Sequence, residues 1–164
     1  MSTHTDDAAL ADQSKEHHAA MIRDLARLSS DFAAAATSRT QSTQAKQALE
    51  EWVRDVLIPH AEEEEVTTYG AARELPEGRL LIQSMLAEHA LIRQTAEHMS
   101  AAQDLVEAAT YGRALFDIFD SHQRKENDLI LPLLVDSDTV SLTAVMSSIH
   151  QREHGQHGQH HHQH

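Results

Sequence analysis

Apolar residues recur at helical spacing in long segments of this chain, and that periodicity limits the possible fold more than any other feature. In the first such segment, Met21, Leu25, Leu28 and Phe32 fall on one face of a helix. Comparable stripes follow in three further segments, separated by short polar or Gly- and Pro-containing stretches. The predicted long helices cover residues 12–36, 44–69, 79–103 and 107–134.

Composition favours an all-α fold. The chain has only 5 Gly and 3 Pro in 164 residues, and helix-favouring Ala, Leu, Glu and Gln outnumber β-branched and aromatic residues. Amphipathic helices joined by short connections bury their apolar stripes against a common axis. The sequence therefore predicts an up-down-up-down four-helix bundle over residues 12–134, preceded by about a dozen loosely held residues.

A short fifth helix and a tail are expected after the bundle. Apolar residues return at helical spacing after a turn at 135–139, which predicts an amphipathic helix over residues 138–153. Residues 154–164 are low in complexity and rich in histidine, so we expect them to be disordered. Seven of the 14 histidines lie in the last 15 residues, and those within the helical part need a separate explanation.

Charge and cysteine content exclude several classes of function. With 13 basic and 26 acidic residues the formal net charge is −13, so neither nucleic acid nor an anionic membrane surface is an expected partner. The chain has no cysteine, which excludes disulfides and thiolate-bound metals. No apolar run approaches the roughly 18 residues of a membrane span, and the N-terminus lacks the pattern of a secretory signal. We expect a soluble, cytoplasmic protein, and the sequence does not indicate its oligomeric state.

Two histidine–glutamate pairs share the pattern H-x-x-x-E. They are "HAEEE", His60 to Glu64, and "HQRKE", His122 to Glu126. Residues four apart share a helix face, so in each pair both side chains point the same way.

Both pairs fall on the apolar stripes. His60 lies four residues after Val56 and seven after Val53, which continues the inward face of the second helix. Beyond Glu126 the stripe of the fourth helix resumes at Leu129. We therefore expect each histidine and each glutamate of the two pairs to face the core.

The other two long helices each offer one histidine at a matching position. His89 lies four residues after Met85 in the third helix, and His18 lies three residues before Met21 in the first. His17, the neighbour of His18, falls on a face that is expected to meet solvent and is the alternative candidate in that helix.

Together these side chains predict a metal site. A single such histidine can be an ordinary hydrogen-bonded core residue, a single i,i+4 pair can serve only helix stability, and the run 62–65 of four glutamates can be a solvated face. The conjunction on four helices favours metal binding, because an unpaired carboxylate in the core costs several kcal/mol. The predicted ligands are His18, His60, Glu64, His89, His122 and Glu126.

The ligand types narrow the choice of metal. Imidazole and carboxylate without thiolate suit iron, manganese or zinc. Six side chains are too many for one four-coordinate zinc ion. They suit two ions about 3.5–4 Å apart that share carboxylates, and iron fits this arrangement best.

The order His, H-x-x-x-E, His, H-x-x-x-E resembles that of the hemerythrin-like (HHE cation-binding) proteins over about residues 12–134. The surroundings "IPHAEEEEVTTYG" and "HQRKENDLILP", including Pro59, are also similar to this family. The resemblance implies a non-haem di-iron centre with an oxo or hydroxo bridge, in which Glu64 and Glu126 are bridging carboxylates. It also implies small ligands such as dioxygen, peroxide or nitric oxide, or the sensing of oxygen or iron.

One departure from the family pattern bears on function. Oxygen-carrying hemerythrins have a further histidine four residues after the position of His89, and this chain has Arg93 there; His98 falls on the opposite face. One iron then lacks a protein ligand unless water, Tyr69 or an outer group supplies it. Arg93 itself could aim its donors at a bound anion, pair with a carboxylate, or simply extend its long side chain to solvent. An open position favours a peroxide- or nitric-oxide-consuming oxidoreductase, with catalase- or peroxidase-like activity, over reversible oxygen carriage.

Two other functions remain open at this level. The histidine-rich tail would bind transition-metal ions weakly, as expected of a metal-storage or metal-delivery protein without turnover. A sensor that uses the fifth helix as an interface is the third possibility. The sequence assigns no catalytic residue, and it does not decide whether the protein is an enzyme.

Overall fold

A computed structural model of the chain describes residues 2–147, and all of its elements in this range are helices. No strand forms among these residues, so the predicted all-α class is confirmed. In chain order the helices are α1 (Ser2–Ser38), α2 (Ser42–Trp52), η1 (Val53–Leu57), α3 (Ile58–Val66), α4 (Thr68–Arg73), α5 (Gly78–Ala101), α6 (Leu105–Lys125), η2 (Glu126–Ile130) and α7 (Leu131–Val135).

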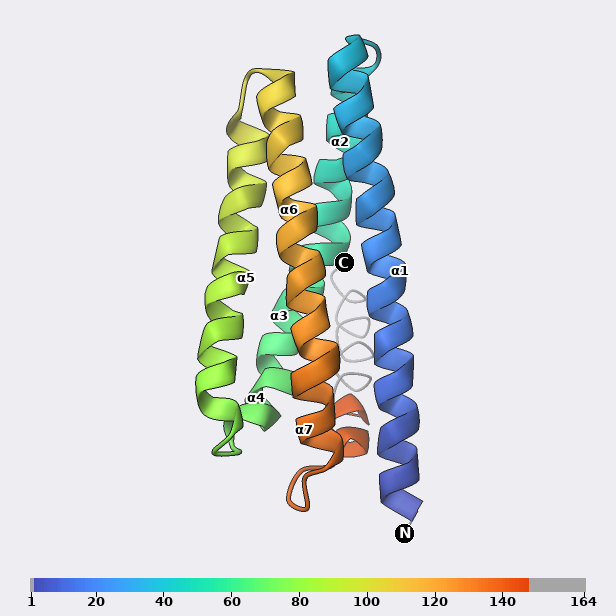
Figure 1. Ribbon diagram of the computed structural model, residues 1–164, viewed down its shortest axis with the longest axis vertical. Coiled ribbons are helices and arrows are strands. Elements are labelled where there is room, and N and C mark those ends of the chain that lie inside the picture. Colours follow the sequence, from blue (N-terminus) through green and yellow to red (C-terminus); the bar gives the residue numbers. More distant parts are fainter. Residues whose placement is uncertain (1, 148–164) are drawn as a thin grey trace, which may run out of the picture.

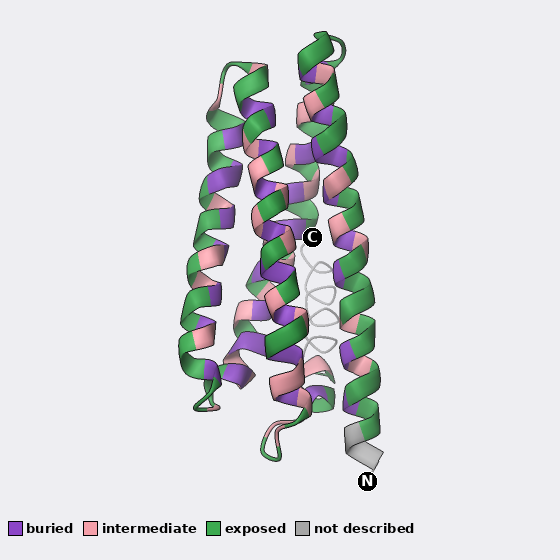
Figure 2. Ribbon diagram, in the orientation of Figure 1, coloured by how far each residue is buried: buried purple, intermediate pink, exposed green. Residues whose placement is uncertain are grey.

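The chain runs back and forth along the long axis of the molecule (Figure 1). It passes along the molecule in α1, returns through α2, η1 and α3, passes along it again in α5, and returns through α6, η2 and α7. Helix α6 packs against both α1 and α5, and α2 packs against α1. Buried and exposed residues alternate along each helix, as expected when amphipathic helices turn one face to a shared interior (Figure 2).

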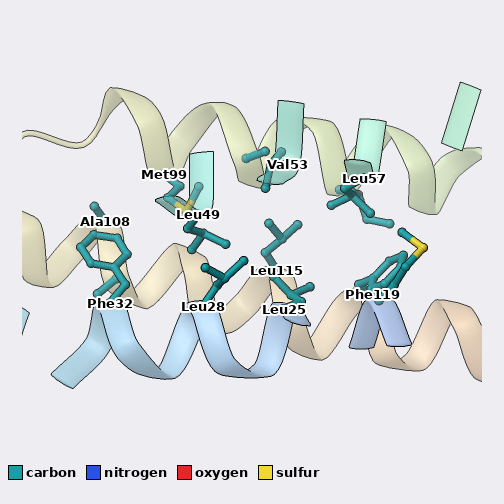
Figure 3. Close-up of a cluster of buried hydrophobic side chains, with 14 of the residues drawn as sticks. Leu25, Leu28, Phe32, Leu49, Val53, Leu57, Met99, Ala108, Leu115 and Phe119 are labelled. Carbon is teal, nitrogen blue, oxygen red and sulfur yellow. The ribbon is translucent and has the colours of Figure 1, made fainter. Parts of the chain in front are cut away.

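The interior consists of two clusters of buried apolar side chains. The larger cluster extends along the helices, with Phe32 and Leu49 at one end of the close-up and Leu57 and Phe119 at the other (Figure 3). The smaller cluster includes Met85 and Ile130, and lies towards the ends of α5 and α6 that meet α4 and α7. Each fully buried side chain of this size contributes on the order of 1.5–3 kcal/mol. The predicted metal ligands lie along the helices between these two clusters.

Two helical runs contain a π-helical turn that the sequence pattern did not predict. The turns are η1 and η2, and each closes with a backbone hydrogen bond to the carbonyl five residues earlier. Pro59 and Pro132 follow the turns by two positions. Proline has no N–H to donate, and in an α-helix its ring would clash with the carbonyl four residues earlier, so the wider turn accommodates it.

Because of the π turns, two residues that were expected to face the core lie outside it. Each π turn holds one more residue than an α turn, which rotates the following helix relative to a regular 3.6-residue period. Val56 and Leu129 are consequently 36% and 49% exposed, whereas Leu57 and Ile130 occupy the core positions instead. The prediction that Val56 and Leu129 continue the inward stripes was wrong.

The N-terminal residues expected to be loose are helical, because α1 begins at Ser2. Buried Asp7 accepts hydrogen bonds from the backbone N–H of Leu142 (3.3 Å) and from the N–H (2.9 Å) and Oγ1 (2.7 Å) of Thr143. Residues 142–147 are helical, so Asp7 caps the first turn of a helix far away in the sequence. The rest of the predicted helix at 138–153 beyond residue 147, and the tail at 154–164, lie outside the described residues.

The described part of the chain contains no helix with the length and apolar character needed to cross a bilayer.

Substitution Asp7→Ala should lower the free energy of unfolding by about 1–2 kcal/mol, because the N–H groups of Leu142 and Thr143 lose their acceptor. Denaturant unfolding followed by circular dichroism measures the change. Asp6→Ala is the matched control, since Asp6 is exposed, and should leave stability within about 0.5 kcal/mol. Equal effects of the two substitutions would contradict the capping role.

Candidate metal centre

The six residues predicted to bind metal come together in the interior. They form two overlapping groups, and within each group one ligand atom from every residue lies within 4.8 Å of the others. The first group is His18, His60, Glu64 and Glu126. The second group is Glu64, His89, His122 and Glu126. Both glutamates therefore belong to both groups, and each group adds two histidines of its own.

The two groups differ in their access to solvent. We call the histidines of the first group, His18 and His60, the outer half, and those of the second, His89 and His122, the inner half. The outer side chains are 7% and 17% exposed, and the inner ones 1% and 0%. A cavity of about 580 Å³ is lined by both outer histidines and both shared glutamates, but by neither inner histidine. Small molecules therefore reach the centre from the outer side.

Glu64 lies between the two halves. Its Oε1 is 3.0 Å from Nε2 of His60 in the outer half and 3.9 Å from Nε2 of His89 in the inner half. The side chain is 9% exposed, in contrast to exposed Glu62 of the same acidic run. Burial, reinforced by the charge of Glu126, raises the pKa of Glu64 well above its usual value. Burial at this position therefore favours the protonated form of the carboxyl.

Glu126 lies between the halves from the opposite side. Its Oε1 is 3.0 Å from Nε2 of His122, and its Oε2 is 3.4 Å from Nε2 of His18. Burial alone would raise the pKa of Glu126, but the surrounding His122, Glu64 and His18 lower it below its usual value. Glu126 is the first residue of η2, so the π turn begins at this predicted ligand.

Side chains from neighbouring helices orient three of the four histidines. Each of these rings contacts an oxygen acceptor through Nδ1: the pairs are His18–Asn127 (2.8 Å), His89–Glu65 (2.8 Å) and His122–Glu88 (2.7 Å). Carboxylate and amide oxygens only accept, so Nδ1–H donates and the lone pair of a neutral ring is left on Nε2. In all three rings Nε2 faces the shared glutamates, which is the orientation a metal ligand requires.

Sequence reasoning missed these three hydrogen-bond partners, although a signal for them exists. Glu65 follows Glu64, Asn127 follows Glu126, and Glu88 precedes His89, so each is the immediate sequence neighbour of a ligand. Each nevertheless supports a ligand on a different helix, a relation that one helix's periodicity cannot reveal.

The two carboxylate partners are themselves paired with cations. Glu65 Oε1 lies 2.9 Å from Nη2 of Arg93, and Glu88 is bonded to Nζ of Lys125. Partial burial would raise the pKa of each carboxyl, but the bonds from the histidine and the cation lower the pKa of both below their usual values. Arg93 therefore lies one carboxylate away from the centre, and pairing with a carboxylate was one of the three expectations for it.

Tyr69 lies at the inner half. A break in helical geometry at Thr67, between α3 and α4, turns this side chain into the core, where it is fully buried. Its hydroxyl is 3.3 Å from Nε2 of His89 and 2.9 Å from Nε2 of His122, and it donates to Oε1 of Glu126. Burial, followed by the charges of the two shared glutamates, raises the pKa of Tyr69. One phenolic proton thus faces three acceptors.

His17 was the alternative to His18, and the structure places His18, but not His17, in a group of potential ligand atoms. His17 is exposed and belongs to neither group of ligand atoms. Its ring centroid lies 5.4 Å from that of His60, and it lines the cavity at the outer half. Its position is at the rim of the centre.

The group of buried histidines and glutamates has more hydrogen-bond acceptors than donors, as a cation site does. Burial lowers the pKa of His60 to about 3 and also lowers the pKa of His18 and His89, so these rings are neutral near pH 7. Among the described residues, buried atoms without a hydrogen-bond partner include Nε2 of His60, Oε1 of Glu64 and Oε2 of Glu126. Buried acceptors left without partners are costly, and a multivalent cation bound between them would satisfy all three.

Comparison with known families identifies the arrangement. Residues 9–134 match the model of the hemerythrin HHE cation-binding domain. The chain belongs to the hemerythrin HHE family. No curated protein and no solved structure matches it. Membership makes this hemerythrin HHE domain a metal-binding protein, and the clustered histidines and glutamates are the part of its interior suited to that role.

Substitution Glu64→Gln should have opposite effects on the metal-free and metal-loaded protein. The pKa of Glu64 is raised in the folded state, so this carboxyl lowers stability above its unfolded pKa, and the cost grows as pH rises towards the folded value. Metal-free Glu64→Gln should therefore be more stable than metal-free wild type at pH 7.5, on the order of 1–3 kcal/mol, with the difference vanishing near pH 4. In the loaded protein the same change removes a ligand and should lower the melting temperature.

Thermal melts at both pH values, with and without metal, measure these differences. Glu62→Gln changes an exposed member of the same run and should alter neither state. A loss of stability in metal-free Glu64→Gln at pH 7.5 would show that the Glu64 carboxylate is satisfied without a cation.

Proposed function

We propose that this protein is a non-haem di-iron protein whose two ions are held inside an up-down-up-down four-helix bundle. The observation that carries the proposal is the pair of overlapping ligand groups that share Glu64 and Glu126. A carboxylate that lies within reach of histidines on both sides can bridge two ions, whereas a single ion would leave one half of the centre without a partner.

The donor set supports iron. Imidazole and carboxylate donors without thiolate suit iron or manganese, and a structural zinc ion would be satisfied by four of them. In the proposed centre His18 and His60 would hold one iron and His89 and His122 the other, and Glu64 and Glu126 would be shared. Tyr69 supplies the inner half with a further oxygen donor, in place of the histidine that oxygen-carrying relatives have at the position of Arg93.

The surroundings support reaction with small oxygen or nitrogen ligands. Iron bound in such a centre exchanges electrons with dioxygen, peroxide or nitric oxide. The cavity beside His18 and His60 gives such molecules a route to the centre. We infer a peroxide- or nitric-oxide-consuming activity in preference to reversible oxygen carriage.

Storage or delivery of metal is the alternative function, and the inner half argues against it. His89 and His122 are at most 1% exposed, and a carboxylate, Glu65 or Glu88, accepts a hydrogen bond from each ring. Such a site suits a resident cofactor more than cargo that must be released. A sensor without turnover would use the same centre, and an absence of peroxide and nitric oxide consumption by iron-loaded protein would favour it.

Purified protein should contain about two irons per chain and absorb in the near ultraviolet through oxo-to-iron charge transfer. Metal analysis and absorption spectroscopy measure both quantities, and peroxide consumption by the loaded protein measures the activity. A well-folded preparation that takes up zinc and refuses iron would contradict the proposal.

Tyr69→Phe tests the role of the phenol. If Tyr69 binds iron, oxidised wild type should show a visible phenolate-to-iron absorption band that Tyr69→Phe lacks, since only a tyrosine oxygen gives this transition. Tyr111 is the only other tyrosine of the chain, and its ring lies 5.3 Å from that of His98, a residue outside the centre. Tyr111→Phe should keep the band, and a wild type without any such band would remove Tyr69 from the ligand set.

A further inference from the structure

The two halves of the centre differ in what stands behind their histidines. Both inner rings donate Nδ1–H to a carboxylate, His89 to Glu65 at 2.8 Å and His122 to Glu88 at 2.7 Å. In the outer half, His18 donates to the neutral amide oxygen of Asn127 at 2.8 Å. Within residues 5–147 no side-chain hydrogen bond involves His60 Nδ1.

A carboxylate behind an imidazole increases its strength as a ligand. The hydrogen bond places negative charge on the ring, makes Nε2 more basic and fixes the ring's orientation. Loss of one such partner typically lowers metal affinity about 10- to 100-fold. The inner half has two of these partners and the outer half has none, so the ligands themselves predict unequal affinity.

Two cationic side chains hold Glu65 and Glu88 in place from the solvent side. Arg93 pairs with Glu65 at 2.9 Å and Lys125 pairs with Glu88. Their side chains are 34% and 33% exposed, so solvent screens their charge while the two carboxylates stand between them and the centre. They therefore fix the geometry of Glu65 and Glu88 more than they oppose a cation at the centre.

Burial adds to the asymmetry. His89 and His122 are at most 1% exposed and lie against Tyr69, whereas His60 is 17% exposed and lines the cavity together with His18. An ion in the outer half can therefore exchange with solvent through the cavity, and an ion in the inner half can leave only past the outer half or by local opening of the helices.

We propose that the two halves load in a fixed order: the inner half binds first and tightly, and the outer half binds second and exchanges, with Glu65 and Glu88 as the positioning residues that set the difference. This inference rests on the proposed two-ion centre and adds to it the order and inequality of binding.

Cobalt(II) added stepwise to the metal-free full-length protein tests the order, with calorimetry for affinity and visible absorption for coordination. Wild type should bind two ions in two resolved steps, the first at least tenfold tighter. His18→Ala should retain the tight step and lose the weak one. His89→Ala should lose the tight step, which assigns that step to the inner half.

The hydrogen-bond partners of the histidines are tested both by removing a carboxylate and by adding one. Glu65→Gln and Glu88→Gln should each weaken the first step about 10- to 100-fold and change the second less than about threefold. Asn127→Asp gives His18 the carboxylate that it lacks and should tighten the second step, which narrows the gap. Exposed Glu62→Gln is the control and should change neither step. Circular dichroism checks the fold, and Asn127→Asp provides a test that removes no native partner of the inner half.

The outcomes separate the two proposals. Two cobalt ions bound with equal affinity, equal weakening of both steps by Glu65→Gln, or an unchanged second step in Asn127→Asp would overturn the loading order while leaving a two-ion centre intact. Fewer than two ions bound to well-folded wild type would overturn the two-ion centre, and the loading order with it.

Discussion

The repulsion between two buried carboxylates is the constraint on which the rest of this structure depends. Glu64 and Glu126 lie in a helical interior between two apolar clusters, where charge is poorly solvated and like charges interact strongly. The histidines around them are neutral and present lone pairs, and Tyr69 offers a single phenolic proton, so no positive charge of the protein offsets two carboxylates, and Glu64 is driven towards its protonated form. A cation bound between the two carboxyls would replace that proton, and we therefore expect metal binding and folding to be coupled in this chain.

The side chains that accept hydrogen bonds from the histidines connect the centre to the bundle as a whole. Asn127 of η2 holds His18 of α1, Glu65 of α3 holds His89 of α5, and Glu88 of α5 holds His122 of α6. Every one of these bonds joins two helices, so the rings are positioned by the packing of the bundle and the packing is in turn fixed by the rings. Such a network pre-orients Nε2 lone pairs before an ion arrives, which reduces the cost of ordering the site on binding.

Much of the site could be predicted from the sequence because ligands and core residues share one period. His18, His89 and the two H-x-x-x-E pairs fall on apolar stripes, and the structure brings all of them together. The π turns could not be predicted from a 3.6-residue period, and they moved Val56 and Leu129 out of the core even though His60 and Glu126 kept their places. Pro59 and Pro132 were visible signals, but a proline within a helix can produce a kink, a break or a wide turn.

Charged residues were the harder part of the prediction. Glu65 and Glu88 look like ordinary surface glutamates on acidic helices, and only the tertiary structure shows that each bonds a ligand on another helix. Asp7 was placed in a loose N-terminal segment for the same reason, because its partners lie more than a hundred residues away at 142–143. Long-range polar pairs leave no periodic signature in the sequence.

Magnetic resonance of oxidised, iron-loaded protein tests the central claim most directly, namely that Glu64 and Glu126 hold two ions together. Two ferric ions bridged by shared ligands couple antiferromagnetically, so a sample with about two irons per chain should show almost no isolated high-spin ferric signal. A ferric signal that integrates to the full iron content would mean that the ions are uncoupled, and the two glutamates would then not be bridging ligands.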